Sequence, residues 1–306
     1  MKSSILIIGS SNTDMVIKTT HLPAPGETVL GGTFFMNAGG KGANQAVAAA
    51  RLGGQVSFVA KTGDDIFGTQ AIELFQSEGI DISCIVTDPQ HPSGVALISV
   101  DSHGENCIVV APGANAALAP ADLEQALSKL HAASIILMQL ETPVETVEYV
   151  ARIAAERKII FVLNPAPACQ LSDEILKNVS VITPNQREAQ MLTGIKITGH
   201  ASAQQAAEAL HDKGIKTVII TMGPQGALLS HEKKCTLIEA PKVIPADTTA
   251  AGDVFNGALV VALAENKSME EAVRFACRAA AISVTRLGAQ ASAPYRSEVM
   301  SVPVNQ

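Results

Sequence analysis

The segment Asp247–Leu259 reads DTTAAGDVFNGAL and guides the interpretation of the whole chain. Two acids, Asp247 and Asp253, flank five small residues, and an apolar helical pattern runs from about Ala251 to Glu265. The first amides of a helix lack internal partners and lie at the positive end of its dipole, so this turn suits an anion. A phosphate could approach the backbone closely at its small residues, which are Ala250, Ala251 and Gly252.

Asp253 lies in the first turn of this expected helix, and its pattern supports two interpretations. Acids are favoured at this place because they compensate the helix dipole. Alternatively, the carboxylate is a general base that takes a proton from an attacking hydroxyl while backbone amides hold the transferring phosphoryl group.

Outward from this segment, strands and helices alternate along most of the chain. The expected strands are Ile5–Ile8, Gln55–Ala60, Ile135–Gln139, Ile159–Leu163, Val181–Thr183, Thr217–Thr221, Ala227–Ser230 and Cys235–Glu239. The expected helices include Lys41–Leu52, Phe67–Ser77, Val144–Glu156, Asn185–Leu192 and Ser202–Lys213. Repeated βα units favour an α/β fold whose central, mostly parallel sheet carries helices on both faces. We expect one domain over residues 1–306.

The segment His21–Gly40 is dense in glycine and proline and interrupts this alternation. Four short strands could pair around it, at Thr28–Leu30, Thr33–Met36, Val95–Val100 and Asn106–Val110. They predict a small β-sheet from about residues 15–40 and 94–111 that projects from the core as a lid. Lids commonly exclude water from a reaction, although an ordinary surface hairpin would give the same pattern.

Polar residues near strand ends form a second group of candidates. The segment Ala38–Ala46 reads AGGKGANQA and lacks the GxxxxGK[ST] pattern of a phosphate-binding P-loop. Lys41 and Asn44 could bind hydroxyls there with the backbone amides, or Lys41 could be a solvated charge. Asn12 and Asp14 follow the first strand, where ligands of open α/β sheets bind, but an Asx-turn is the alternative.

Three further segments have simple structural interpretations beside functional ones. Glu141 follows a strand in MQLE, as a rim charge or a ligand-binding acid would. The sequence TPNQRE has capping-box spacing from Asn185 to Glu188. The segment Thr221–Gly226, TMGPQG, is either a tight turn between strands or a loop that lets a nucleotide approach closely.

Composition argues against several classes of function. The 306 residues are 47% hydrophobic, which is enough for a large core, and the formal net charge of −7 disfavours nucleic-acid binding. No apolar run reaches membrane-spanning length. Five scattered cysteines without a CxxC pair disfavour disulfides and zinc. We expect a cytoplasmic protein that binds neither nucleic acid nor membranes.

Taken together and in order, the motifs resemble the ribokinase family of sugar kinases. They are GSSNTD, PAPGET, AGGKGANQA, TGDD (Thr62–Asp65), LNPAP (Leu163–Pro167), TPNxxE, TxGxxG, DTTAAGDVFNGAL and TRLGAQAS (Thr285–Ser292). The resemblance covers nearly the whole chain. It implies a ribokinase-like α/β fold with a β-sheet lid, and phosphoryl transfer from magnesium ATP to the 5-hydroxyl of D-ribose.

The resemblance also implies roles for individual residues. Asp253 would be the catalytic base, beside an anion hole made by Ala250, Ala251 and Gly252. The sugar would be bound by Asn12, Asp14, Gly40, Lys41, Asn44, Glu141 and Asp253. The nucleotide, with Mg²⁺ near its phosphates, would be bound by Asn185, Glu188, Thr221, Gly223, Gly226 and Gly252. A monovalent cation, usually K⁺ in the family, would be held by Asp247, Thr249, Ser283, Arg286, Gly288 and Ser292.

Two other functions fit the sequence. A kinase for another small sugar or a nucleoside, such as 2-deoxyribose or pseudouridine, would use the same scaffold, and Phe34 and Phe35 could contact a base. A non-catalytic sugar sensor is the second alternative, but it would not need to keep Asp253. The exposed edges of the expected lid predict a symmetric homodimer that pairs two lids.

Overall fold

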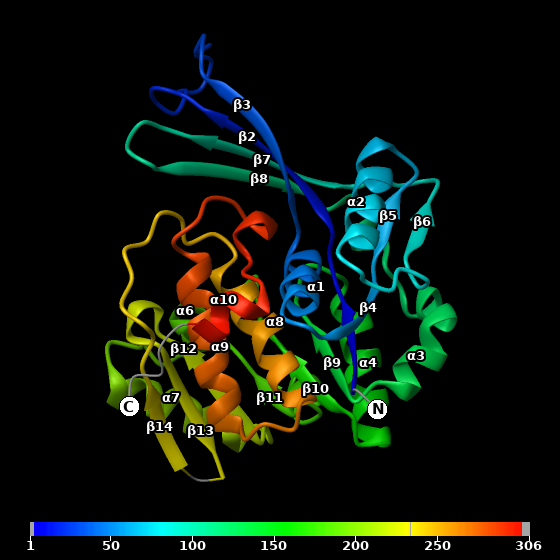
Figure 1. The fold of residues 1–306 in the computed structure, drawn as a ribbon, viewed down its shortest axis with the longest axis vertical. Coiled ribbons are helices and arrows are strands. Elements are labelled where there is room, and N and C mark those ends of the chain that lie inside the picture. Colours follow the sequence, from blue (N-terminus) through cyan, green and yellow to red (C-terminus); the bar gives the residue numbers. More distant parts are fainter. Residues whose placement is uncertain (1–2, 233, 302–306) are drawn as a thin grey trace.

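The structure, a computed structural model, describes residues 3–232 and 234–301 and is built around one large sheet (Figure 1). Its eight strands lie in the order β14-β13-β12-β11-β10-β9-β1-β4. They are β1 (Ser4–Ile8), β4 (Gln55–Val59), β9 (Ile135–Met138), β10 (Ile160–Leu163), β11 (Val181–Ile182), β12 (Thr217–Thr221), β13 (Ala227–His231) and β14 (Lys234–Ile238). The six strands from β4 to β12 are parallel, and β13 and β14 continue the sheet as antiparallel strands. The predicted fold class is confirmed.

Helices cover both faces of this sheet because its central strands are apolar on both sides. In β1, Leu6 and Ile8 pack into one core while Ile5 and Ile7 pack into the other. The first core is covered by α3 (Leu127–Ala132), α4 (Val144–Arg157), α5 (Asp173–Leu176), α6 (Gln186–Thr193) and α7 (His200–Asp212). The second is covered by α1 (Lys41–Arg51), α2 (Ile66–Ser77), α8 (Ala251–Ala264), α9 (Met269–Ser283) and α10 (Arg296–Ser301).

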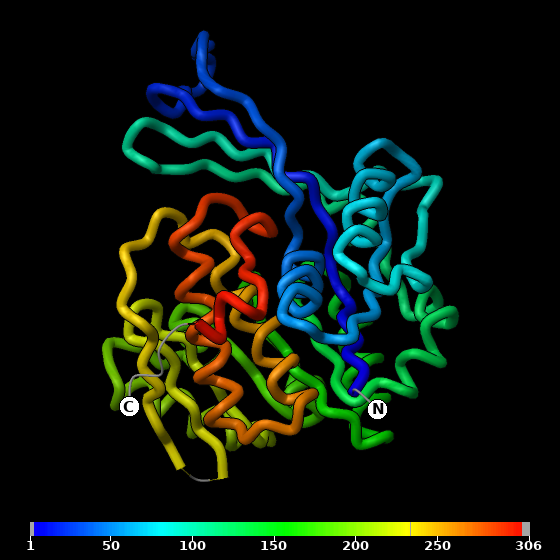
Figure 2. The backbone as a smooth tube through the Cα atoms, in the orientation of Figure 1, coloured from blue at the N-terminus to red at the C-terminus, as the bar shows by residue number. Residues whose placement is uncertain are grey.

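A second sheet projects from this body, at the top of Figures 1 and 2. Its four strands lie in the order β3-β2-β7-β8 and are β2 (Asn12–Lys18), β3 (Thr33–Gly39), β7 (Gly94–Val100) and β8 (Asn106–Ala111). The sequence analysis missed β2. It also placed a strand at Thr28–Leu30, which is wrong: this segment forms no ladder, and Leu30 is 91% exposed. The preceding prolines and Gly26 favour a loop there.

Other elements were not assigned from the sequence. They include α3, the whole of α9 and the two-stranded sheet of β5 (Lys61–Gly63) and β6 (Val86–Asp88). Helix α9 does carry a start signal, because Ser268 and Glu271 form a capping box. In the described part of the chain, no helix is both long and apolar enough to cross a membrane.

Helices α1 and α8 lie in direct contact, and this contact builds the site. A Cβ atom at Gly257 of α8 would stand 2.8 Å from the Cβ of Ala48 and 2.8 Å from the carbonyl oxygen of Gln45. The glycine therefore lets the two helix backbones approach closely. Hydrogen bonds between their first turns, described below, show that the two N-termini meet.

Candidate active site

The meeting point of α1 and α8 holds the carboxylate of Asp253, which is only 5% exposed. Its Oδ2 accepts a hydrogen bond from Asn44 Nδ2 at 2.9 Å, and its Oδ1 accepts one from Gln45 Nε2 at 3.0 Å. Burial raises the pKa of Asp253, while the positive charge of Lys41 and the two amide donors oppose that rise. Each oxygen keeps lone pairs free, so an ionised Asp253 can accept a proton.

The turn before Asp253 exposes backbone to a large pocket. Ala250 adopts a left-handed conformation with φ of 58°, which turns the chain into α8. The Ala251 amide makes a long contact of 3.3 Å with the Thr248 carbonyl. A Cβ atom at Gly252 would meet nothing within 4 Å, so this backbone is open to an approaching group. An anion can therefore reach the positive end of α8.

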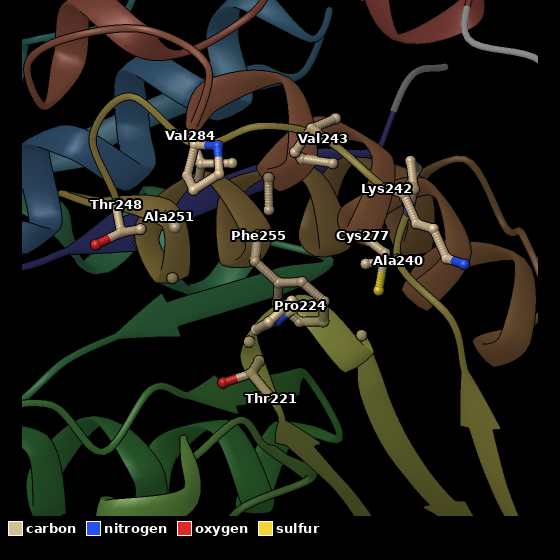
Figure 3. Close-up of a pocket in the computed structure, with 17 residues that line it drawn as sticks. Thr221, Pro224, Ala240, Lys242, Val243, Thr248, Ala251, Phe255, Cys277 and Val284 are labelled. Atoms are coloured by element: carbon tan, nitrogen blue, oxygen red, sulfur yellow. The ribbon is translucent and has the colours of Figure 1, made fainter.

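The pocket beside this turn has a volume of about 360 Å³ and mostly apolar walls. In Figure 3, Phe255 and Pro224 lie at its centre, with Thr248 and Ala251 towards one side. Its other lining residues include Thr221, Gly223, Gly226, Ala240, Val243, Cys277 and Val284. The segment after β12 is thus both a tight turn, Gly223–Gln225, and a pocket wall. An apolar compartment that opens onto a helix N-terminus suits a nucleotide base and its phosphates.

Glycines bring the start of α1 against the end of β1. Gly40 has φ of 87°, and a Cβ atom there would stand 2.7 Å from the Asn12 amide nitrogen. The following Lys41 amide donates to Glu141 Oε2 at 3.0 Å, and Ser10 Oγ donates to the same oxygen at 2.5 Å. Glu141 is therefore bound to the N-terminus of α1 and is not a free rim charge.

Asp14 joins this cluster from the small sheet. Asn12 and Asp14 pair with Gly39 and Asn37 in the ladder of β2 and β3, so the Asx-turn alternative is wrong. Burial and then repulsion from Glu141 raise the pKa of Asp14 to about 6. The carboxyl therefore lies within electrostatic reach of the Asp253 site.

Lys41 faces four acids, and it is the cation that balances them. Burial alone would lower its pKa, but the acids Asp253, Glu141, Glu188 and Asp14 together raise it. The lysine is therefore charged at neutral pH. The charges of four acids therefore act on one ammonium group, but in the described part of the chain no group of three or more acids is placed to hold a metal ion by itself.

The first turn of α6 reaches the same site through Glu188. The predicted capping box is confirmed: Asn185 Oδ1 accepts from the Glu188 amide at 2.9 Å, and Glu188 Oε2 accepts from the Asn185 amide at 2.8 Å. Glu188 is 8% exposed, and burial raises its pKa. Its charge is coupled to those of Lys41 and Asp253.

Comparison with known proteins agrees with this geometry. The model of the pfkB family carbohydrate kinases matches residues 2–296. The chain belongs to this family.

A ribokinase from Haemophilus influenzae is 47% identical over 300 residues, covering 98% of each chain. A deoxyribokinase from Salmonella typhi is 37% identical over 291 residues, 95% of each chain. The structure of an Arabidopsis thaliana ribokinase complexed with ribose and ATP has a TM-score of 0.91, with 32% identity over 98% of each chain. The predicted family is confirmed.

This pfkB family kinase also brings together part of the predicted cation set. Asp247 Oδ1 accepts from the Thr249 amide at 2.8 Å, and Oδ2 accepts from the Gly288 amide at 3.0 Å. These hydrogen bonds lower the pKa of Asp247 against the opposing effect of burial. The Arg286 amide donates to the Ser283 carbonyl at 3.0 Å. Ser292 Oγ instead donates to the Ala289 carbonyl at 2.8 Å. A carboxylate with nearby carbonyls and hydroxyls has the oxygen chemistry that K⁺ needs.

Sequence reasoning missed several polar residues of the kinase site. Gln45 lies in the quoted AGGKGANQA motif and Asn164 in LNPAP, yet neither was singled out. Asn115, which is 1% exposed, donates from Nδ2 to Asn12 Oδ1 at 2.8 Å. Only the folding of distant segments onto one another shows that these amides contact predicted site residues.

Proposed function

We propose that this chain transfers the terminal phosphoryl group of ATP to the 5-hydroxyl of D-ribose and forms ribose 5-phosphate. The observation that carries the proposal is the buried Asp253 at the start of α8, beside an open glycine turn and the polar residues Asn44 and Lys41. The ribokinase relatives support ribose as the sugar.

In the proposed reaction, the sugar hydroxyl attacks the terminal phosphorus of ATP, and the bond to the bridging oxygen breaks to release ADP. Asp253 takes the hydroxyl proton as the general base. The backbone amides at Ala250, Ala251 and Gly252 stabilise the charge on the phosphoryl oxygens. The sugar would be held by Asn12, Asp14, Gly40, Lys41, Asn44 and Glu141. The pocket lined by Thr221, Gly223 and Gly226 would take the nucleotide.

Mg²⁺ would enter this site with the nucleotide. Asn185 and Glu188 are the residues proposed to lie nearest to it, and the nucleotide phosphates would supply the further oxygen ligands that these two residues alone do not provide. Glu188 Oε1 and Oε2 both accept hydrogen bonds from Asn185, and Mg²⁺ commonly keeps waters that bridge to carboxylates. When bound, the ion would neutralise phosphate charge.

A monovalent cation would bind at Asp247, which precedes the anion-hole turn in the chain. The carboxylate of Asp247 is its main proposed ligand, with groups of Thr249, Ser283, Arg286, Gly288 and Ser292. Asp247 is already hydrogen-bonded to both neighbouring segments, so a cation there would brace the turn without touching substrate. We therefore expect K⁺ to raise turnover.

The small sheet would act as a lid and also pair two copies of the chain. On the Asp14 face, Val16 and Ala96 are buried, while Ile108 and Val110 on the edge strand β8 are each 51% exposed. The opposite face carries the exposed apolar residues Ile17, Phe34, Met36, Leu97 and Val109, which are neighbours across the ladders. An apolar face of this kind is typical of an interface. We propose a symmetric homodimer that covers it.

A second candidate substrate is 2-deoxyribose, because a relative of nearly full length is a deoxyribokinase. A nucleoside has less support. Phe34 lies on the lid face opposite to Asp14, and Phe35 on the Asp14 face already packs under Lys18 Nζ at 5.7 Å.

The test is coupled ADP release with ribose, 2-deoxyribose, fructose, adenosine and pseudouridine, each in K⁺ and in Na⁺. Turnover that depends on ribose and rises with K⁺ is the expected result. Turnover with 2-deoxyribose alone would identify 2-deoxyribose as the substrate in place of ribose. Turnover with only a nucleoside would contradict the assignment of a sugar as the substrate. No turnover with any of them would contradict the kinase proposal and favour a sugar sensor.

A further inference from the structure

A buried carboxamide, Gln45, lies between Asp253 and the interior of the protein. Its side chain is fully buried at 0% exposure, where an unpaired amide would be costly. Gln45 Oε1 accepts from Gln139 Nε2 at 2.5 Å, and the acceptor oxygens of Asp253 and Asn164 require the NH2 end of the Gln45 amide on their side. Both Nε2 hydrogens then have acceptors, Asp253 Oδ1 at 3.0 Å and Asn164 Oδ1 at 3.1 Å.

The hydrogen bonds continue from Asn164 back to α8. Asn164 Nδ2 donates to the Thr183 carbonyl at 3.2 Å, and Thr183 Oγ1 donates to Asn256 Oδ1 at 2.7 Å. Asn256 Nδ2 donates to the Gly252 carbonyl at 2.8 Å. The path leaves the carboxylate of Asp253 and returns to the peptide that joins Gly252 to Asp253. The neutral members of this ring, Gln45, Asn164, Thr183 and Asn256, are all buried, and the ring closes at Asp253.

This ring connects the two parts of the site that phosphoryl transfer uses. At one end, an amide donor faces the carboxylate, and such a donor favours the charged form over the protonated one. At the other end, a second amide fixes the peptide beside the open turn, and fixed dipoles stabilise a developing charge best. Residues that are joined in one buried hydrogen-bond network resist independent movement.

We propose that Gln45 is a positioning residue that aims the Asp253 carboxylate and keeps it ionised. We further propose that the ring of Gln45, Asn164, Thr183 and Asn256 holds the base and the Gly252 turn as one unit. The inference rests on the proposed kinase function, and it deepens the description of that site. A ring that served only for packing would stabilise the fold but would not affect the ionisation of Asp253.

The first test replaces the amide with an apolar side chain of similar length, Gln45→Met. We expect kcat to fall about 10- to 100-fold, a part of the roughly 10²–10⁴-fold effect of a whole general base. The KM for ribose should change by less than about threefold, because the sugar-binding groups are intact. The acidic limb of the kcat profile should move to higher pH, because Asp253 loses a donor to its charged form. Gln205→Met, at an exposed position of α7, is the matched control.

A second measurement needs no substrate and separates this inference from the proposed function. Carbon-13 NMR of labelled aspartate, with the Asp253 signal assigned from Asp253→Asn, reports the carboxyl pKa in the free protein. A higher pKa in Gln45→Met supports the inference even if the wild type fails to phosphorylate ribose. An unchanged pKa together with an unchanged kcat profile overturns it, whatever the melting temperature does.

A third variant, Asn256→Ala, cuts the ring where it meets Gly252 and leaves every contact of Asp253 in place. We expect a lower kcat for this variant. In the double variant with Gln45→Met, we expect the fold decrease in kcat to be smaller than the product of the fold decreases of the two single variants. Residues that act as one unit behave in this non-additive way. Strictly multiplicative effects would reject the shared unit.

Discussion

At the scale of the residue, Asp253 is the proposed general base. Replacing it by asparagine removes the proton acceptor but keeps the shape of the side chain. We expect Asp253→Asn to bind ribose and to lose about 10²- to 10⁴-fold in kcat, the range typical of general-base loss. Calorimetry of ribose binding and steady-state ADP release measure the two effects. Turnover near that of the wild type would show that another group takes the proton.

The raised pKa of Asp14 predicts that this residue lowers the stability of the protein at neutral pH, although it is proposed to bind the sugar. Its pKa of about 6 in the folded protein exceeds the ordinary value of 3.8, so its contribution to stability is present below pH 3.8 and is lost as the pH rises through 6. Asp14→Asn stays neutral at all pH values. We expect it to raise the free energy of unfolding at pH 8 by about 1–3 kcal/mol, to have little effect below pH 4, and to weaken ribose binding.

Urea unfolding at pH 8 and at the lowest pH that keeps the protein folded measures this effect. Asp212→Asn, at an exposed position of α7, controls for the loss of one negative charge. Equal stability of Asp14→Asn and wild type at pH 8 would contradict the raised pKa.

At the scale of the element, two glycines of α8 have different expected roles. Gly257 allows α1 and α8 to pack closely, and Gly252 leaves room for the phosphates. Gly257→Ala would place a methyl group 2.8 Å from Ala48 Cβ and from the Gln45 carbonyl, so α1 and α8 must move apart. We expect a loss of about 1–3 kcal/mol, in spite of the better helix propensity of alanine. Gly252→Ala meets nothing within 4 Å, so its stability should be unchanged or higher, but the methyl group should hinder the phosphates.

Thermal unfolding and ATP kinetics distinguish these variants. The expected pattern is a lower melting temperature for Gly257→Ala and a higher KM for ATP or a lower kcat for Gly252→Ala. Since the two changes are chemically identical and lie in one helix, each variant serves as the control for the other. A melting temperature that falls for Gly252→Ala instead would contradict the open turn.

At the scale of the whole molecule, we propose that the lid face opposite to Asp14 pairs two copies of the chain. Leu97 is 54% exposed at the centre of this apolar face, beside Met15 and Val109 in the ladders. We expect the wild type to be a dimer and Leu97→Lys to be a monomer, because each copy would bury an unpaired ammonium group in a symmetric interface. Met191→Lys, at an exposed position of α6, should remain a dimer.

Light scattering at micromolar concentration measures this effect for all three proteins. A monomeric wild type would refute the pairing of lids. A dimeric Leu97→Lys would move the interface to another surface of the molecule.

The sequence by itself determined the α/β class, most of the large sheet, the capping box of α6 and the membership in the family. These features depend on short-range information: the apolar pattern of ILII or of the segment that forms α8, and caps at fixed spacing such as Asn185 to Glu188. The membership in the family came from the order of the motifs, because whole motifs carry more information than single residues. Local signals failed where a strand begins with polar residues, as β2 does at Asn12.

Only the tertiary structure decided which polar groups meet. The hydrogen bond from Gln45 to Asp253 joins residues 208 positions apart, and that from Thr183 to Asn256 joins residues 73 apart. A helical pattern shows only that Gln45 lies inside α1, and nothing in that pattern names its partner. The partner is fixed by the close packing of α1 on α8 at Gly257, since a buried amide must be paired and the nearest acceptors are those that the fold provides.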